Sequence, residues 1–392
     1  MPHRNPTPPH ARLIAGIPVT NRALYHRIRF QVGDPTAYIE LLDDQGAVTH
    51  TILLLRDIEM ERARAATTVD AVASPSDFAP ESGLSGDRET ATAQAVAECL
   101  RQHDVRIVDA DRTLPLSFAH EIEHAGIQLR YDPDLGVAER RSKDAREIQW
   151  LRDAQATTEQ AIRMACTRIA HAAAHADGVL HEGSQPLTAE IIRTAIDVFL
   201  LERGYANPAC IVAGGPQGAD CHHRGTGPLR TGEPIIIDVF PQNQNTLYNG
   251  DCTRVVVHGN VPDEIAAMHQ AVVDAKQAAI QAIRAGVSGE SVHDAATQVL
   301  TDKGYELGLP TQPQNPPVAS MVHGTGHGIG LEVHEPPLLD RNGPPLVAGD
   351  ALTVEPGLYK PGLGGIRIED MVIVTEHGCD NLNTLPEDLD WS

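Results

Sequence analysis

Residues 323–334 read His323-Gly324-Thr325-Gly326-His327-Gly328-Ile329-Gly330-Leu331-Glu332-Val333-His334. This segment holds three histidines within twelve residues. Its glycines let the backbone approach an ion or a substrate closely. A lone histidine is more often a surface residue or a hydrogen-bonded core residue. Here the cluster, together with acidic residues farther along the chain, favours a metal or substrate site.

Outward from this segment, the sequence repeats itself loosely. A predicted helix ends in Gly-Tyr at residues 204–205 and again at 304–305. In each half a glycine then leads into an apolar strand, and a carboxylate follows that glycine by six residues. After a loop, a second strand has a carboxylate near its start. The carboxylates of the first half are Asp238 and Asp251, and those of the second half are Glu355 and Glu369.

The alternative interpretation of these four carboxylates is that they are unrelated acids at strand ends, which are common and usually solvated. That interpretation suits a single residue. The intervals from Asp238 to Asp251 and from Glu355 to Glu369 differ by only one residue. Two similar halves that face one another would bring all four carboxylates to a common axis, so the matched spacing favours a shared site.

Four carboxylates and one histidine form a donor set that suits a divalent cation. Hard ions such as Mn²⁺ prefer carboxylate oxygens, while one imidazole widens the choice to Zn²⁺, Co²⁺ or Fe²⁺. We therefore expect divalent metal, most readily Mn²⁺, and we expect the histidine to come from residues 323–334.

Composition excludes several classes of function. The 392 residues exceed the needs of one ordinary domain, so two domains are the starting expectation. A net charge of -22 would repel a phosphate backbone or an anionic membrane surface, which argues against nucleic-acid and membrane partners. Residues 1–9 lack the apolar stretch of a secretory signal and are expected to be an irregular tail. The six cysteines show no paired spacing, and reduced thiols in a cytoplasmic protein are the prediction.

The region before residue 141 has the patterns of a smaller, separate unit. Apolar runs at residues 38–42 and 51–55, separated by a turn signal, predict a hairpin. Helical spacing follows at 90–102 and a strand pattern near 106–108. We place the domain boundary near residues 141–145, where a long amphipathic helix begins that is expected to run to about residue 173.

Two further motifs complete a family pattern around the histidine segment: Val354-Glu355-Pro356-Gly357-Leu358-Tyr359 and Gly365-Ile366-Arg367-Ile368-Glu369-Asp370. Together they resemble the pita-bread metallopeptidases, specifically Xaa-Pro aminopeptidase and Xaa-Pro dipeptidase (prolidase). The resemblance is strong from residue 141 to 392 and weak before it, where residues 55–59 carry it. It implies an α/β (α+β) fold with a creatinase-type N-terminal domain, residues 1–142, followed by a pseudo-symmetric pita-bread catalytic domain, residues 143–392.

The resemblance also implies a ligand set and a reaction. Asp238 would hold one metal ion, Asp251 and Glu369 would bridge two ions, and His327 with Glu355 would hold the other. The implied activity is hydrolysis of the peptide bond that precedes proline, through a hydroxide that bridges the two ions. The alternatives on this fold are a creatinase-like hydrolase and a non-catalytic binding module. Because such relatives replace metal ligands, the intact set favours the peptidase.

The resemblance implies roles for further residues as well. His222 and His334 would contact the substrate and the tetrahedral intermediate, and His323 would line the proline side. Glu355 is the candidate for carrying a proton to the leaving nitrogen, and Arg367 would orient the ligand carboxylates. The substrate would be a peptide with proline after the scissile bond, and the length of that peptide is left open. The resemblance also implies that the chain forms a homodimer.

The loop that carries His222 departs from the family pattern. Cys221 stands where the usual residue is proline, so the register of the loop is open and the adjacent His223 is an alternative to His222. We assign Cys221 a packing role, because a thiol nucleophile is unnecessary where metal ions activate water.

Overall fold

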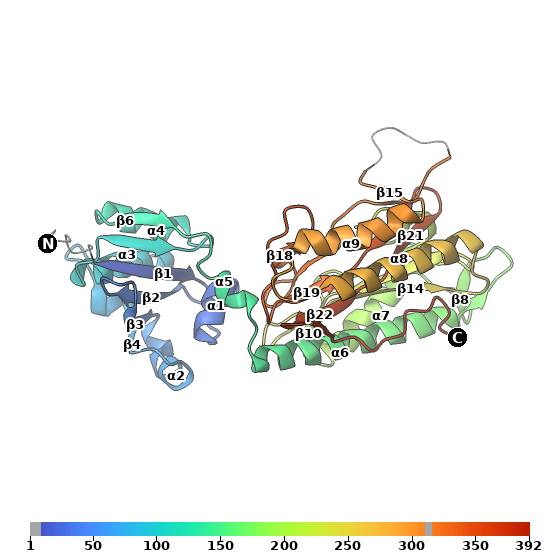
Figure 1. Cartoon of the computed structure of the whole chain (residues 1–392). Coiled ribbons are helices and arrows are strands. Elements are labelled where there is room, and N and C mark those ends of the chain that lie inside the picture. The colour runs from blue at the N-terminus through green and yellow to red at the C-terminus, as the bar shows by residue number, and fades with distance from the viewer. Residues whose placement is uncertain (1–8, 310–315) are drawn as a thin grey trace. The chain divides into compact units, whose positions relative to one another are not determined.

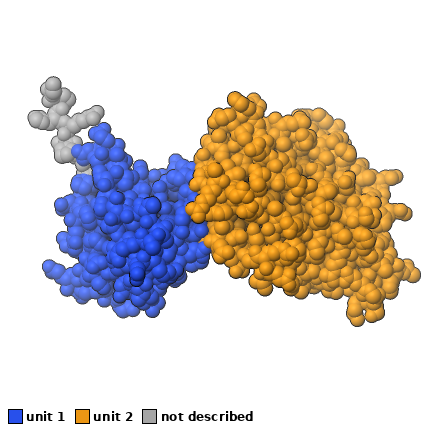
Figure 2. Space-filling model, turned by 90° about the horizontal axis from the view of Figure 1, so that it is seen from below, with its two compact units in different colours: residues 1–140 blue, residues 141–392 orange. Residues whose placement is uncertain are grey.

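The computed structural model describes residues 9–309 and 316–392, so most of the expected N-terminal tail lies outside it. The chain divides into two compact units, residues 1–140 and 141–392 (Figure 2). Among the helices that are described, none combines the length and the hydrophobicity that crossing a bilayer requires. Each unit has its own core and is taken in turn below.

Strands of the first unit form a sheet in the order β4-β3-β2-β1-β5-β6 (Figure 1). The predicted hairpin is confirmed, because β2 and β3 pair antiparallel around the turn at Asp43. The elements of this unit are β1 (His10–Gly16), α1 (Arg22–Ile28), β2 (Thr36–Leu42), β3 (Val48–Leu54), α2 (Met60–Ala66), β4 (Ala71–Ala73), α3 (Arg88–Gln102), β5 (Ile107–Ala110), α4 (Leu116–His124) and β6 (Gln128–Tyr131), with α5 (Ala138–Arg141) at the division.

Helices cover both faces of this sheet. Neighbouring residues of a strand point to opposite faces, so consecutive residues of β1 pack against different helices. Leu13 of β1 packs with Val96 of α3 and Phe118 of α4. The next residue, Ile14, belongs to a second cluster that includes Leu24 of α1. The first unit is therefore a three-layer α/β domain with two apolar clusters.

The second unit begins with the long helix that the sequence predicted. Asp144 accepts hydrogen bonds from the first turn of α6, and Glu147 reaches back to the backbone of Asp144, which makes a capping box. The helices and first strands of this unit are α6 (Ala145–Ala170), β7 (Ala173–Ala174), β8 (Leu180–Glu182), β9 (Gln185–Pro186), α7 (Ala189–Leu201), β10 (Tyr205–Ala206), β11 (Ile211–Gly214), β12 (Pro234–Val239), β13 (Gln242–Asn243), β14 (Cys252–Val257), α8 (Asp263–Ala282) and α9 (Gly289–Asp302).

The remaining strands of the second unit all follow α9. They are β15 (Glu306–Leu307), β16 (Ser320–Met321), β17 (Gly326–Gly328), β18 (Glu335–Leu339), β19 (Ala351–Val354), β20 (Gly357–Lys360), β21 (Gly364–Arg367), β22 (Asp370–Val374) and β23 (Cys379–Asn381). The sheets that matter for the site have the orders β11-β12-β14, β18-β17-β19-β22-β23 and β15-β16-β20-β21.

Helices cover the strands of this unit on two sides, α6 and α7 on one and α8 and α9 on the other (Figure 1). Side chains along β12 alternate in direction, so this one strand packs against both layers of helices. Ile236 packs in the cluster that holds α8 and α9, whereas Ile235 and Ile237 pack against α6 and α7. β12 is thus buried on both faces.

Candidate metal centre

A cavity of about 300 Å³ opens between the two halves of the second unit. All nine residues that the sequence singled out line it: Asp238, Asp251, His327, Glu355, Glu369, His222, His323, His334 and Arg367. The two halves of the repeat therefore contribute to one cavity, as the matched spacing of their carboxylates suggested.

The strands place the four carboxylates at equivalent positions. Asp238 lies in β12 opposite Thr253 of β14, and Asp251 directly precedes β14. In the second half, Glu355 directly follows β19, and Glu369 directly precedes β22. The backbone N–H of Glu369 donates to the carbonyl oxygen of Thr253 over 3.1 Å, so the two halves are joined beside the carboxylates.

Atoms suited to binding a cation converge in this cavity. Asp251, His327 and Glu369 each offer one ligand atom, and these three atoms lie within 4.8 Å of one another. Nδ1 of His327 lies 3.1 Å from the carbonyl oxygen of Gly328 and is assigned as the donor, because a carbonyl only accepts. Nε2 lies 3.3 Å from Glu355 Oε1 and 3.8 Å from Asp251 Oδ2. Although burial opposes it, Glu355 raises the pKa of His327, so that Nε2 carries a proton and donates it to Glu355 when no cation is bound. A cation would take the place of that proton, between the imidazole nitrogen and the carboxylate oxygens.

The electrostatics of the carboxylates also fit a cation. Burial, reinforced by neighbouring carboxylates, raises the pKa of Asp251 and of Glu369 well above their usual values. Burial likewise raises the pKa of Asp238, although Arg367 opposes the shift. Oδ1 of Asp238 is buried and has no hydrogen-bond partner among the residues that the structure describes. A buried, unpartnered carboxylate oxygen beside further carboxylates is the environment that a divalent ion would stabilise.

Glu355 behaves differently from the other three carboxylates. Burial alone would raise its pKa, but the hydrogen bond with His327 and the nearby positive groups lower it to about 2. The carboxylate of Glu355 is therefore ionised at neutral pH even without a bound cation.

Glycines allow the backbone to pack tightly around His327. A Cβ atom on Gly326 would lie 2.0 Å from the carbonyl oxygen of Thr353, and one on Gly328 would lie 2.4 Å from that of Glu335. Both contacts are impossible for a side chain, so the close strand packing that aims His327 into the cavity requires glycine on each side.

Arg367 begins a chain of hydrogen bonds behind the carboxylates. Its Nη2 donates to Asp238 Oδ2 over 2.6 Å and its Nη1 to the Tyr359 hydroxyl over 2.8 Å. The Tyr359 hydroxyl lies 2.7 Å from Nε2 of His323, whose Nδ1 lies 2.7 Å from the carbonyl oxygen of Gly324. The carbonyl of Gly324 can only accept a hydrogen bond, so the proton of the ring is on Nδ1. Nε2 of His323 therefore accepts a hydrogen bond from the hydroxyl of Tyr359. Both ring nitrogens of His323 are thus engaged within the protein, and its ring face is what it offers to the cavity.

The remaining histidines differ in their exposure to the cavity. The rings of His334 and His327 have centroids 4.2 Å apart, and burial lowers the pKa of His334. His222 lines the cavity, while its neighbour His223 is absent from the described lining residues. Nδ1 of His223 instead accepts a hydrogen bond from the N–H of Gly225 over 2.9 Å.

Several residues of the site were not predicted from the sequence. Tyr359 was quoted only as part of a motif, and the hydroxyl of Thr253, which donates to Glu369 Oε2 over 2.7 Å, was not considered. The apolar wall was missed altogether: Ile211, Phe240, Val333 and Leu338. The available signal for Thr253 was its position two residues after Asp251, on the same side of the strand.

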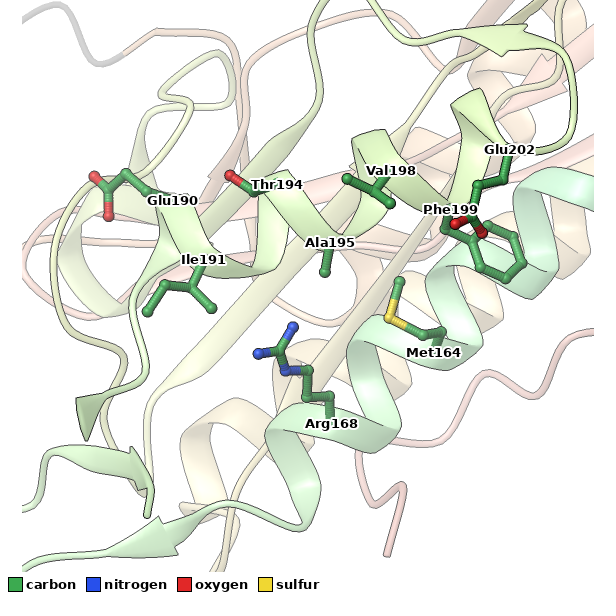
Figure 3. Close-up of a pocket in the computed structure, with 9 residues that line it drawn as sticks. All are labelled: Met164, Arg168, Glu190, Ile191, Thr194, Ala195, Val198, Phe199 and Glu202. Atoms are coloured by element: carbon green, nitrogen blue, oxygen red, sulfur yellow. The ribbon is translucent and has the colours of Figure 1, made fainter. Parts of the chain in front are cut away.

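A second hollow of about 600 Å³ lies on the outer surface of the same unit, between α6 and α7 (Figure 3). Its walls are mainly apolar, with Met164 on one helix and Ile191 and Val198 on the other. Arg168 at its edge is already paired with Glu182. This hollow holds no ligand set among its described lining residues, so the chemistry is assigned to the cavity with the carboxylates.

Comparisons with known proteins agree with this location. The model of metallopeptidase family M24 matches residues 149–376. The probable dipeptidase PepE of Mycobacterium tuberculosis is 38% identical over 193 residues, 48% of each chain. The Xaa-Pro dipeptidase of Pyrococcus furiosus is 28% identical over 202 residues, 50% of this chain and 54% of the relative. The chain thus spans about half the length of the curated relatives it matches.

Structural similarity extends farther than sequence similarity. The solved structure of the Xaa-Pro dipeptidase from Bacillus anthracis has a TM-score of 0.78 at 22% identity, covering 97% of this chain and 94% of that one. At this identity the likeness concerns the fold, and it confirms the fold class predicted from the sequence.

Proposed function

Because the chain belongs to metallopeptidase family M24, we propose that it is a metal-dependent peptidase that hydrolyses the peptide bond preceding a proline. The observation that carries the proposal is the meeting of four carboxylates and His327 in one cavity. The substrate class is supported by the names of two relatives, a dipeptidase and an Xaa-Pro dipeptidase.

The five ligands would divide between two cations. We assign Asp238 to one cation, Asp251 and Glu369 to both, and His327 with Glu355 to the other. Mn²⁺ is the favoured metal because carboxylate oxygens dominate the donor set, while the single imidazole keeps Co²⁺, Zn²⁺ and Fe²⁺ open. When bound, the two cations supply a water of lowered pKa and polarise the scissile carbonyl.

Glu355 is the proposed proton carrier. As an ionised carboxylate, Glu355 would accept a proton from the attacking water, whose own pKa the bound cations would lower. It then passes this proton to the proline nitrogen as the peptide bond breaks. Arg367 keeps Asp238 oriented through its 2.6 Å hydrogen bond while charge moves in the cavity.

His222 and His334 are the proposed partners of the reacting carbonyl. A ring N–H that points at the carbonyl oxygen stabilises the negative charge that develops there in the transition state. His323 has no free ring nitrogen, so its ring face is assigned to the wall that receives the proline ring. Phe240 and Val333 would exclude water from the same space.

A substrate panel tests the proposal. Protein shown to hold metal is incubated with an Xaa-Pro dipeptide, a longer peptide with proline second, an Xaa-Ala dipeptide and creatine. We expect the Xaa-Pro bonds to be cleaved at least about tenfold faster than the Xaa-Ala bond. Cleavage of the dipeptide alone assigns a dipeptidase, and cleavage of the longer peptide assigns an aminopeptidase. Metal-loaded protein that leaves every Xaa-Pro bond intact refutes the proposal, and turnover of creatine would favour the creatinase-like alternative.

We also propose a cytoplasmic location and a homodimeric assembly. The location is supported by the free state of all six cysteines, which suits a reducing compartment. The assembly rests on the family resemblance and is tested by light scattering on the purified chain, where the mass of a monomer at micromolar concentration would contradict it.

A further inference from the structure

Thr325 connects the proposed ligand Glu355 to the histidine segment. The side chain of Thr325 is fully buried, and it lies two residues from both His323 and His327. Its backbone N–H donates to the carbonyl oxygen of Leu339 over 2.8 Å, and its own carbonyl accepts from the N–H of Glu355 over 2.8 Å. A displacement of Thr325 would therefore move Glu355 and both histidines together.

The segment around Thr325 has little stiffness of its own. Gly324 and Gly326 flank it, and glycine restricts the backbone less than any other residue. Thr325 is the residue within 324–326 that carries a side chain, so a side-chain anchor for this stretch has to act through it.

His293, on α9, holds that side chain. Nδ1 of His293 lies 2.9 Å from Oγ1 of Thr325. On the other side of the ring, Nε2 lies 3.8 Å from Oδ1 of Asp340, and the His293 side chain is only 13% exposed. A carboxylate facing Nε2 favours the tautomer with its proton there, which leaves Nδ1 to accept the hydroxyl proton of Thr325.

We propose that His293 is a positioning residue of the metal centre, acting through Thr325. It is not among the described residues that line the cavity, so it would act on substrate and cation only through other residues. Its hydrogen bond with Thr325 fixes the position of the segment that carries His327 relative to Glu355. The bond thereby fixes the distance between His327 and Glu355, the two proposed ligands of one cation. The catalytic part of this inference rests on the proposed function, whereas the effect on metal binding does not.

The same unit contains a matched control. Nδ1 of His258 lies 2.9 Å from Oγ1 of Thr231 and Nε2 lies 2.8 Å from the carbonyl oxygen of Ala172, and neither His258 nor Thr231 is among the described residues that line the cavity. Removing the ring of His258 deletes hydrogen bonds of a partly buried histidine without touching the proposed ligands. His258→Ala therefore separates a general loss of stability from a loss of positioning.

The experiment measures Mn²⁺ affinity of metal-free protein by competition with a chelator, together with kcat and KM on an Xaa-Pro substrate. His293→Ala and Thr325→Val should each weaken Mn²⁺ binding by about tenfold to a hundredfold, the usual effect of losing a residue that orients a ligand. We expect kcat to fall more than KM rises. The double variant should bind Mn²⁺ with about the affinity of the weaker-binding single variant, because the two substitutions remove the same hydrogen bond. His293→Asn, whose amide can reach Thr325 in place of Nδ1, should recover most of the affinity, and His258→Ala should leave it unchanged.

Unchanged Mn²⁺ affinity in His293→Ala or Thr325→Val overturns the proposal, as does an additive double variant. Thr325→Val keeps the β-branched shape of the side chain and removes the hydroxyl, so it keeps the test open if His293→Ala fails to fold. Wild-type protein that binds Mn²⁺ but cleaves no Xaa-Pro bond refutes the proposed function, while the affinity measurements still decide the role of His293.

Discussion

Arg367 and Asp238 form a hydrogen bond of 2.6 Å that uses only one oxygen of the carboxylate. The other oxygen, Oδ1, is buried without a partner in the described part of the chain. The guanidinium thus orients the carboxylate and leaves one oxygen available in the cavity. That division of the two oxygens is what a metal ligand with an orienting partner requires.

Removal of metal should abolish hydrolysis of an Xaa-Pro bond. Treatment with a chelator followed by dialysis is expected to bring the rate to background, because water at neutral pH is a poor nucleophile without a cation to lower its pKa. Addition of Mn²⁺ or Co²⁺ should restore the activity. Full hydrolysis by protein in which elemental analysis detects no metal would contradict this.

Metal binding should release protons, and more of them at lower pH. Asp251 and Glu369 have pKa values raised by burial and by neighbouring carboxylates, so metal-free protein retains protons at a pH where ordinary carboxyl groups are ionised. A cation binds the ionised form and expels those protons. Calorimetry with Mn²⁺ in two buffers of different ionisation enthalpy should show larger release at about pH 6 than at about pH 8. Equal heats in the two buffers at both pH values would count against the raised pKa values.

Asp251→Asn and Glu369→Gln should each lower bound metal as well as rate. Either substitution removes a charge that is proposed to serve both cations, and we expect the metal content to fall from two ions per chain to one or none. Glu159→Gln is the control, because Glu159 is a buried carboxylate that bonds the backbone at Thr384 and Leu385 instead. Retention of two ions in either site variant would remove that residue from the ligand set.

His334→Ala should slow turnover without loss of metal. His334 faces the cavity beside His327 but is assigned to the reacting carbonyl, so its contribution is made in the transition state. We expect kcat to fall by about a hundredfold or more while elemental analysis gives the wild-type metal content. If the metal disappears along with the activity, His334 is a ligand and the assignment of His327 has to be revised.

His222→Ala and His223→Ala should have unequal effects. His222 lines the cavity, whereas the ring of His223 accepts a hydrogen bond within its own loop. We expect the rate for His222→Ala to fall by about a hundredfold or more and that for His223→Ala to stay near wild type, with the metal content of both unchanged. Kinetics of the two variants in parallel settle the choice, and a crippled His223→Ala would mean that His223 is the active residue of the loop.

The strands and the carboxylates they carry were predictable because local sequence specifies them. An apolar run such as Ile235-Ile236-Ile237 predicts a buried strand, and the acid that follows it falls at the strand end. The same holds for the segment before Glu355. Repetition of this pattern at matched spacing was sufficient to predict that both halves share one cavity.

What the sequence did not predict depends on packing between distant segments. The chain of hydrogen bonds from Arg367 through Tyr359 to His323 forms only where two strands and a loop meet. No local sequence pattern predicts that meeting. The bond between His293 and Thr325 likewise joins a helix to a strand segment. The choice between His222 and His223 depended on the direction of two adjacent side chains in one turn, which identity alone does not determine.

The division of the ligands between the two halves has a consequence for biosynthesis. Asp238 and Asp251 leave the ribosome well before His327 and Glu355, and Glu369 follows last. A chain that has been made only as far as β14 therefore holds half of the proposed donor set and offers no complete coordination sphere. Tight binding of the proposed cations would require both halves to be made and folded together.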